Sequence, residues 1–267
     1  MISVIIPTCN RHDMLSQCLD CLSSNKQKFS EAAVEVIVTD DSNNDKTKKM
    51  ISRFYPFVKW IRGPKNGPAA NRNNGARKAR FDWLIFIDDD CLPSDHLIGS
   101  YYREIKKGKQ LALEGSIYAE RPQSRYDEEA PLNIKGNHFW SCNIAISKLI
   151  FHQINGFDEG FPYPAMEDTD FFIRVKEMVG VKFLKNASVI HPWRRMVPFA
   201  SYKKHLASHR YFRSKHHETI TISYRLKRLK ILLGFLVNDS ILLSKYSFKG
   251  TGFFMEKVLL NFLMIFN

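Results

Sequence analysis

Short runs of apolar and β-branched residues alternate with helix-like segments through the first third of the chain. The expected strands are Ile2–Ile6, Val34–Thr39, Val58–Ile61 and Trp83–Ile87. The expected helices between them are Asp13–Ser23, Lys46–Tyr55 and Ala69–Ala79. Strands and helices that alternate at this rhythm form a mostly parallel sheet covered by helices. The sequence therefore predicts an α/β fold.

Polar clusters directly follow three of these expected strands. They are Thr8–Arg11, Asp40-Asp41 and Asp88–Asp90. In open α/β sheets, ligands bind beyond the carboxyl ends of the strands. Because the strands are parallel, we expect the three clusters to meet at one edge of the sheet and to bind one ligand there.

The run Asp88-Asp89-Asp90 places three negative charges at the end of an apolar strand. Carboxylate oxygens bind hard divalent cations, and such a cation neutralises a departing diphosphate group. Alternate residues of an extended segment face the same side, so Asp88 and Asp90 are expected to act together as metal ligands. The alternative is a solvated turn, which is disfavoured because three adjacent like charges are costly without a cation.

A second acidic cluster, Glu167-Asp168-Thr169-Asp170, begins the helix expected over Glu167–Met178. A carboxylate at this position can act as a general base, which takes the proton from the hydroxyl group of an acceptor substrate. Capping of the helix N-terminus is the alternative, and it would be preferred if this cluster stood alone. Its combination with the upstream aspartates favours a catalytic role.

Six motifs follow one another in residues 1–193, about 70% of the chain. They are Val4–Arg11, Val38–Ser42, Asn66–Asn73, Phe86–Asp90, Gly156–Glu159 and Glu167–Asp170. In this order and spacing they resemble the family 2 glycosyltransferases of the GT-A fold. The resemblance implies a Rossmann-like, mostly parallel sheet. It also implies transfer of a sugar from a nucleotide-sugar, with UDP favoured, and inversion at the anomeric carbon.

The resemblance also assigns the donor-binding residues. The nucleotide pocket would be lined by Pro7, Thr8, Asn10 and Arg11. Asp40 would contact the base and Asp41 would support that loop, while Arg72 would reach the base or the phosphates. Asp89 belongs to the same donor-binding group, without a specific role.

The metal and catalytic residues are implied in the same way. Asp88 would lie toward the ribose and sugar, and Asp90 would ligate Mn²⁺ or Mg²⁺. His191 follows the last expected strand, Val181–Ile190, and is either structural or a further metal ligand. An imidazole beside a carboxylate suits Mn²⁺ better than Mg²⁺. Asp168 matches the general base, with Glu167 beside it to position a saccharide or lipid-linked saccharide acceptor.

Bulky side chains stand where related enzymes shape the sugar pocket. The stretch Asn137–Asn143 contains His138, Phe139 and Trp140, in a segment expected to be strand-like over His138–Ser147. An aromatic ring here can stack on a sugar or fill the core, and the sequence does not decide between these roles.

The C-terminal region, 194–267, has a different composition from the domain expected over residues 1–193. Residues 194–230 hold eleven Lys or Arg against the single acid Glu218, and so carry most of the formal net charge of +13. Basic residues next to helical apolar faces are typical of helices on an anionic membrane surface. A helical hairpin that packs on the catalytic domain or forms a homo-oligomer contact is the alternative. Nucleic acid is not expected as a partner because no recognised module accompanies the charge.

The N-terminus and the cysteines indicate the cellular location of the protein. The start of the chain resembles a strand and lacks the features of a signal peptide. Five Cys without disulfide-like spacing suit a reducing, cytoplasmic compartment.

Two other functions compete with glycosyl transfer. The first is that of a sugar nucleotidyltransferase, but the Gly-rich loop of such enzymes is missing from Ile6–Arg11. A non-catalytic membrane-bound or nucleotide-binding scaffold is another, and it is disfavoured by the intact acidic clusters.

Overall fold

The computed structural model describes residues 1–217 and 219–266, so Glu218 and Asn267 of the charge and domain predictions lie outside the described residues. The chain divides into two compact units. The N-terminal unit comprises residues 1–120, 131–160 and 167–192. The C-terminal unit comprises residues 121–130, 161–166 and 193–267.

The N-terminal unit is built on one eight-stranded sheet in the order β3-β2-β1-β4-β8-β6-β9-β5. The strands are β1 Ile2–Thr8, β2 Val34–Asp40, β3 Val58–Arg62, β4 Trp83–Ile87, β5 Leu92–Pro93, β6 Ala112–Ala119, β8 Asn143–Ser147 and β9 Val181–His191. The half from β3 to β4 is parallel, as expected. Beyond β4 the sheet is mixed, because β8 runs antiparallel to both β4 and β6. The α/β class is confirmed.

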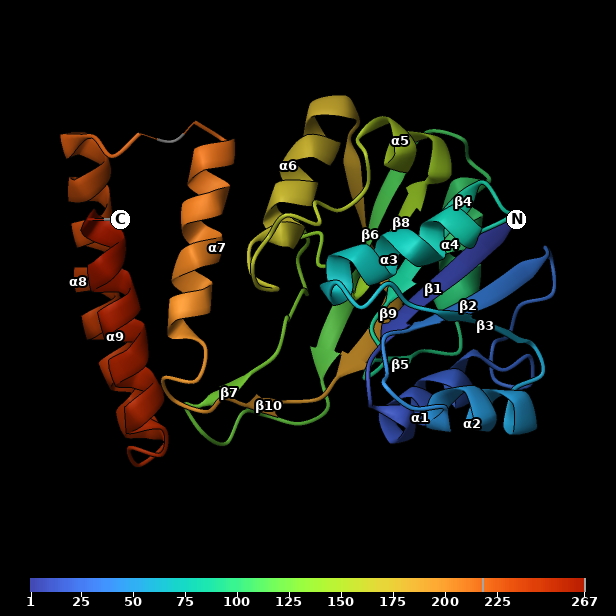
Figure 1. Ribbon diagram of the computed structural model, residues 1–267, viewed down its shortest axis with the longest axis horizontal. Coiled ribbons are helices and arrows are strands. Elements are labelled where there is room, and N and C mark those ends of the chain that lie inside the picture. Colours follow the sequence, from blue (N-terminus) through green and yellow to red (C-terminus); the bar gives the residue numbers. More distant parts are fainter. Residues whose placement is uncertain (218, 267) are drawn as a thin grey trace. The chain divides into compact units, whose positions relative to one another are not determined.

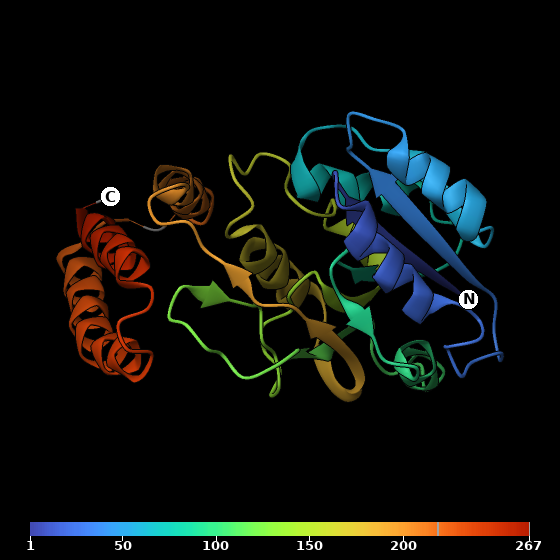
Figure 2. The ribbon, with the colours of Figure 1, turned by 90° about the horizontal axis from the view of Figure 1, so that it is seen from below.

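Helices cover both faces of this sheet (Figures 1 and 2). They are α1 His12–Leu22, α2 Lys46–Phe54, α3 Gly67–Lys78, α4 Leu97–Ile105, α5 Lys148–Gln153 and α6 Glu167–Met178. One buried apolar cluster joins α1, α2 and α4 to the sheet, and a second joins α3, α5 and α6 to its other face. The two-residue strand β5 and the one-and-a-half-turn helix α5 were not anticipated, because elements this short show no periodicity.

The stretch 138–142, expected to be a strand, is a loop, and β8 begins only at Asn143. The buried carboxylate of Glu114 accepts hydrogen bonds from the backbone N–H groups of Asn137, His138 and Phe139. Phe139 also has a φ of 52°, which is incompatible with a strand. The hydrogen bonds to the buried Glu114 carboxylate therefore hold this segment as a loop, against its local preference for extended structure.

Asn143 fills an irregularity between β6 and β9, whose register shifts between Gly115 and Ser116. Its side-chain amide donates to the carbonyl oxygens of Ser116 and Ala187, each at 2.9 Å, and its Oδ1 accepts from Tyr101 Oη at 2.8 Å. These bonds satisfy backbone groups that the interrupted ladder leaves unpaired. Asn143 therefore holds together the strands on both sides of the loop that precedes it.

The C-terminal unit contains a short antiparallel ribbon and a group of helices. Its elements are β7 Glu128–Glu129, β10 Arg194–Arg195, α7 Tyr202–Lys215, α8 Ile222–Lys245 and α9 Thr251–Phe266. Helices α8 and α9 lie side by side (Figures 1 and 2), with the rings of Phe235 and Phe254 stacked at 5.6 Å. Within the described ranges, no helix combines the length and the apolar character needed to span a bilayer.

The role of Asn143 gives a stability prediction. We expect Asn143→Ala to lower the free energy of unfolding by about 3 kcal/mol, because it leaves buried carbonyl groups without donors. Urea denaturation followed by circular dichroism measures the difference. The control is Asn25→Ala on the exposed surface, for which a change below about 0.5 kcal/mol is expected. Equal effects of the two substitutions would contradict the role of Asn143.

Candidate active site

The three aspartates that follow β4 do not lie on an extended segment. Strand β4 ends at Ile87, and the backbone N–H of Cys91 donates to the carbonyl oxygen of Asp88 at 3.1 Å, which closes a turn. The expected alternation, with Asp88 and Asp90 on one side of a strand, is therefore wrong. Each aspartate instead has a different partner.

Asp88 pairs with Arg72, which α3 brings to this edge of the sheet. Arg72 Nη2 lies 2.7 Å from Asp88 Oδ1, and the guanidinium group is almost fully buried over the ring of Phe157. Burial by itself would lower the pKa of Arg72, but the charges of Asp88, Asp168 and Glu167 raise it above its ordinary value. The two predicted acidic clusters thus meet around one arginine.

Asp89 connects the aspartate turn to the end of β1. Its carboxylate accepts from Thr8 Oγ1 at 2.7 Å and lies 3.2 Å from Arg11 Nη1. Burial raises the pKa of Asp89 to about 6, against the lowering effects of Arg11 and Thr8. The sequence assigned Asp89 no specific role. In the structure, Asp89 fixes the aspartate turn to the end of β1.

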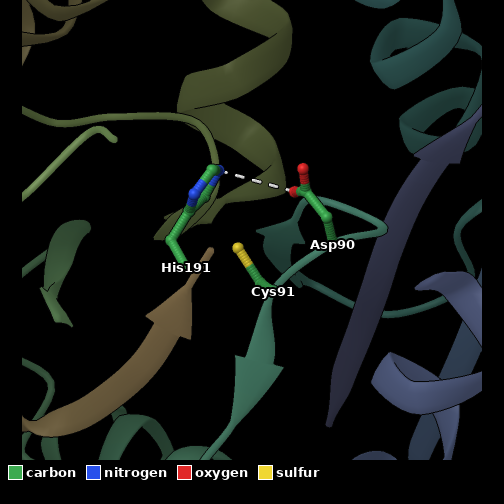
Figure 3. A group of neighbouring side chains, drawn as sticks. All are labelled: Asp90, Cys91 and His191. Carbon is green, nitrogen blue, oxygen red and sulfur yellow. Dashed lines mark ion pairs between the residues drawn. The ribbon is translucent and has the colours of Figure 1, made fainter. Parts of the chain in front are cut away.

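Asp90 lies beside His191, which ends β9. Figure 3 shows their side chains pointing toward each other, with Cys91 next to them. His191 Nε2 is 3.5 Å from Asp90 Oδ1, and both side chains are at least 98% buried. Candidate ligand atoms of Asp90, Cys91 and His191 lie within 4.8 Å of one another. The aspartate and the histidine thus come together as the metal prediction requires.

The contact made by Nδ1 of His191 determines whether Nε2, which faces Asp90, carries a proton or a lone pair. His191 Nδ1 lies 2.7 Å from the carbonyl oxygen of Pro192, which can only accept, so Nδ1 carries a proton. In the neutral ring, Nε2 then points a lone pair at the Asp90 carboxylate. Two facing acceptors repel each other unless a proton or a cation lies between them. A divalent cation fits this donor set of imidazole and carboxylate.

The start of α6 brings Glu167 and Asp168 to the same edge. Asp168 Oδ2 accepts from the backbone N–H of Ser141 at 3.2 Å and from its hydroxyl at 3.1 Å. Asp168 Oδ1 is buried and has no hydrogen-bond partner among the described residues. Burial raises the pKa of both carboxyl groups, and the charge of Asp168 further raises the pKa of Glu167.

Asp170, in the same motif, has a structural role. It is fully buried and forms two hydrogen bonds with Arg174, one turn further along α6. Arg174 in turn donates to the carbonyl oxygens of Ile154 and Gly156. The pair therefore anchors the start of α6, which carries Asp168.

The predicted nucleotide-binding residues lie at the ends of β1 and β2. Pro7 and Thr8 are the last residues of β1, while Asn10 and Arg11 follow it and are exposed. The backbone N–H of Asn10 donates to Ser42 Oγ at 2.7 Å, which joins the two loops. The structure thus brings both loops to the edge that also holds Asp89.

Asp40 and Asp41 both help to shape the loop after β2. Asp40 is buried, and its two oxygens accept from the backbone N–H of Ser42 at 2.9 Å and from Trp60 Nε1 at 3.1 Å. Asp41 is partly exposed and accepts from the backbone N–H of Lys65 at 2.8 Å. Of the two carboxylates, Asp41 is the one that solvent reaches.

The aromatic residues before β8 divide between two roles. Phe139 is fully buried against Phe171 and Phe172, so it fills the core. His138 and Trp140 stack on each other with centroids 5.4 Å apart, and both remain at least partly accessible.

Sequence reasoning missed Ser141 and Cys91. Ser141 stands between the aromatic residues and β8, and nothing in its local sequence indicates a contact with Asp168. Cys91 directly follows the aspartates, and this adjacency could have singled it out. Its Sγ lies 3.7 Å from the carbonyl oxygen of Cys142, and a side-chain hydrogen bond with Cys142 together with burial raises the pKa of the Cys91 thiol.

Known relatives include enzymes of polysaccharide synthesis. The chain is 26% identical over 221 residues to chondroitin synthase of Pasteurella multocida, covering 65% of this chain and 23% of the relative. It is 30% identical over 142 residues to poly(ribitol-phosphate) beta-glucosyltransferase of Bacillus spizizenii, covering 49% and 22%. The chain therefore spans less than a quarter of either relative.

Solved structures share the fold at low identity. Residues 1–349 of TarS of S. aureus, in complex with UDP-GlcNAc, align with a TM-score of 0.59 at 18% identity, covering 85% of this chain and 75% of the TarS 1–349 chain. The mannosyltransferase PcManGT of Pyrobaculum calidifontis, in complex with GDP-Man and Mn²⁺, aligns with a TM-score of 0.57 at 15% identity, covering 77% and 60%. These similarities support the GT-A fold.

Family profiles match both parts of the candidate site. The profile described as "N-terminal domain of galactosyltransferase" matches residues 124–193, which include Asp168 and His191. The profile described as "Glycosyl transferase family 2" matches residues 3–154, more than half of the chain and including the aspartate turn. The chain therefore belongs to glycosyl transferase family 2.

Proposed function

We propose that this chain is a metal-dependent, inverting glycosyltransferase that moves a sugar from a UDP-sugar to a hydroxyl group of a saccharide acceptor. One observation carries the proposal. The buried pair of Asp90 and His191 suits a cation, while Asp168 and Arg72 lie at the same edge of the sheet. A site for the diphosphate and a base for the acceptor would thus be adjacent.

Asp90 and His191 would hold the metal. When bound, a divalent cation would neutralise the negative charge that develops on the departing diphosphate. The imidazole favours Mn²⁺ over Mg²⁺, and the Mn²⁺ complex of the similar structure PcManGT supports this choice. Asp88 was also predicted as a ligand, but its ion pair with Arg72 makes it the second choice. Cys91 is a weaker candidate because its thiol has a raised pKa.

The donor would lie along the loops after β1 and β2. Asp41, which solvent reaches, is the better candidate for a contact with the base, whereas buried Asp40 would support the loop. Arg11 extends from the same edge and would approach the phosphates. Arg72 Nε and Nη1 are buried without hydrogen-bond partners among the described residues, so they can donate to the donor. UDP is preferred because TarS binds UDP-GlcNAc.

Asp168 would act as the general base. Its Oδ2 is held by Ser141, which leaves Oδ1 to accept the proton of the acceptor hydroxyl. The deprotonated oxygen would attack the anomeric carbon as the bond to the diphosphate oxygen breaks, and this single displacement inverts the configuration. A raised pKa makes Asp168 a better proton acceptor than an exposed aspartate. Glu167 would help to orient the acceptor.

The acceptor would belong to a cell-surface polysaccharide or a glycolipid. The relatives are named for chondroitin and for poly(ribitol-phosphate), which supports a polymeric acceptor. A lipid-linked saccharide would place the enzyme on the inner face of the cell membrane. Residues 1–193 would form the catalytic domain, and the helices of 194–267 would contact the membrane surface. A homo-oligomer contact through these helices is the competing role.

The base assignment predicts the effect of Asp168→Asn. We expect kcat for sugar transfer to fall about 10³-fold, while KM for the UDP-sugar changes little, because the amide cannot accept the proton. Release of UDP from a panel of UDP-sugars with saccharide acceptors measures both quantities. Asp13→Asn, an exposed aspartate on α1, is the matched control and should keep full activity. Full activity of Asp168→Asn would refute the assignment.

The metal assignment predicts a stability effect that does not depend on activity. Mn²⁺ should raise the melting temperature of the wild type, because binding to the folded state stabilises it. His191→Ala should reduce this shift strongly, whereas His152→Ala, an exposed histidine of α5, should leave it unchanged. Differential scanning fluorimetry with a Mn²⁺ titration measures the shift. The same shift in all three proteins would exclude His191 as a ligand.

A further inference from the structure

Helix α8 carries apolar side chains on two opposite faces. One face packs within the C-terminal unit, where Leu243 belongs to a buried cluster with Tyr126 and Phe253. The opposite face is exposed and forms a stripe with residues spaced three or four apart. This α8 outer stripe consists of Ile222, Leu226, Leu229, Leu233, Val237 and Ile241. Its side chains are between 42% and 80% exposed.

An apolar stripe of this kind requires a covering partner. Contiguous exposed apolar patches mark interaction sites on proteins. The spacing of the α8 outer stripe places its residues on one side of the helix over about five turns. It is therefore a continuous surface and differs from the scattered single apolar residues that are common on proteins.

Positive charge accompanies the α8 outer stripe. Lys227 and Lys230 are exposed on the same helix, on turns that the stripe residues share, whereas the guanidinium group of Arg225 lies 6.0 Å from the ring centroid of Phe266 on α9. The only acid of α8 is Asp239, which lies on the packed side and accepts a hydrogen bond from Tyr126 Oη at 2.9 Å. The exposed side of α8 thus combines apolar and basic groups without an acidic one.

We propose that the α8 outer stripe docks on an anionic lipid surface, with its apolar residues entering the headgroup boundary and its basic residues contacting lipid phosphates. Helices with one apolar and one basic face bind in this way, lying in the plane of the membrane surface. The proposal rests on the membrane location proposed above and names the surface responsible. Sugar transfer is not required for docking, so the two proposals can fail separately.

A second copy of the chain fits this surface less well. A symmetric dimer with parallel α8 helices would bring Lys227 and Lys230 of both copies into one patch. Like charges would then face each other in an interface that offers no acidic groups from α8. A surface rich in anionic phosphates complements the same groups.

Flotation of the full chain with lipid vesicles tests the proposal. The wild type should float with vesicles that mix phosphatidylglycerol with phosphatidylcholine, and much less with phosphatidylcholine alone. The double variant Leu226→Glu, Leu233→Glu should lose flotation, because it places charges in the apolar stripe. The matched control, Leu111→Glu with Leu149→Glu, changes two exposed leucines of the N-terminal unit and should float like the wild type.

A second pair of variants tests the basic groups without altering the apolar stripe. Replacing both Lys227 and Lys230 by Gln should lower the partition coefficient for anionic vesicles about 25-fold, since each near-surface lysine contributes about fivefold. Its control replaces the exposed lysines Lys26 and Lys109 by Gln and should show little change. Circular dichroism of all variants confirms that they are folded.

Three results would overturn the proposal. The first is a folded wild type that does not float with anionic vesicles. The second is flotation that survives both changes to α8. The third is light scattering that shows a dimer which the Leu226→Glu, Leu233→Glu variant dissociates while flotation remains unchanged, because the stripe would then bind a second copy.

Discussion

Charge compensation at the edge of the sheet is the constraint on which the rest of the structure depends. The carboxylates of Asp88–Asp90, Glu167 and Asp168 gather there, and Arg11 and Arg72 are among their cationic partners. Buried like charges raise one another's pKa and destabilise the fold unless they are paired. Arg72 balances part of this charge permanently, and a divalent cation beside Asp90 would balance more of it. We therefore regard the excess of carboxylates at this edge of the sheet as the feature that most directly supports the proposed metal-dependent function.

Contacts distant in sequence hold these acids in place. Asn143 and Glu114 fix the strands and the loop on either side of Ser141, and Ser141 holds one oxygen of Asp168. Asp170 and Arg174 anchor the helix that begins with the same motif. The scaffold therefore immobilises one oxygen of the proposed base and leaves the other for the acceptor, which is the kind of preorganisation that catalysis requires.

The sequence predicted the parallel half of the sheet and the convergence of its polar clusters, because strand periodicity and the position of loops after strands are local patterns. The end of β4 at Ile87 was predicted correctly, but the turn at Asp88–Asp90 was not, since the course of the chain after β4 depends on contacts made by each aspartate. The loop 138–142 was misassigned for a similar reason, because its conformation depends on Glu114, more than twenty residues away. Ser141 was missed because only the folded chain brings it to Asp168.

Anomalous X-ray diffraction from crystals grown with Mn²⁺ and UDP tests the central claim most directly. If the acidic edge requires a cation to complete its charge balance, a manganese peak will lie between Asp90 and His191, with the diphosphate of UDP bound beside it. A bound UDP without manganese at saturating Mn²⁺, or a manganese peak away from both residues, would contradict the account.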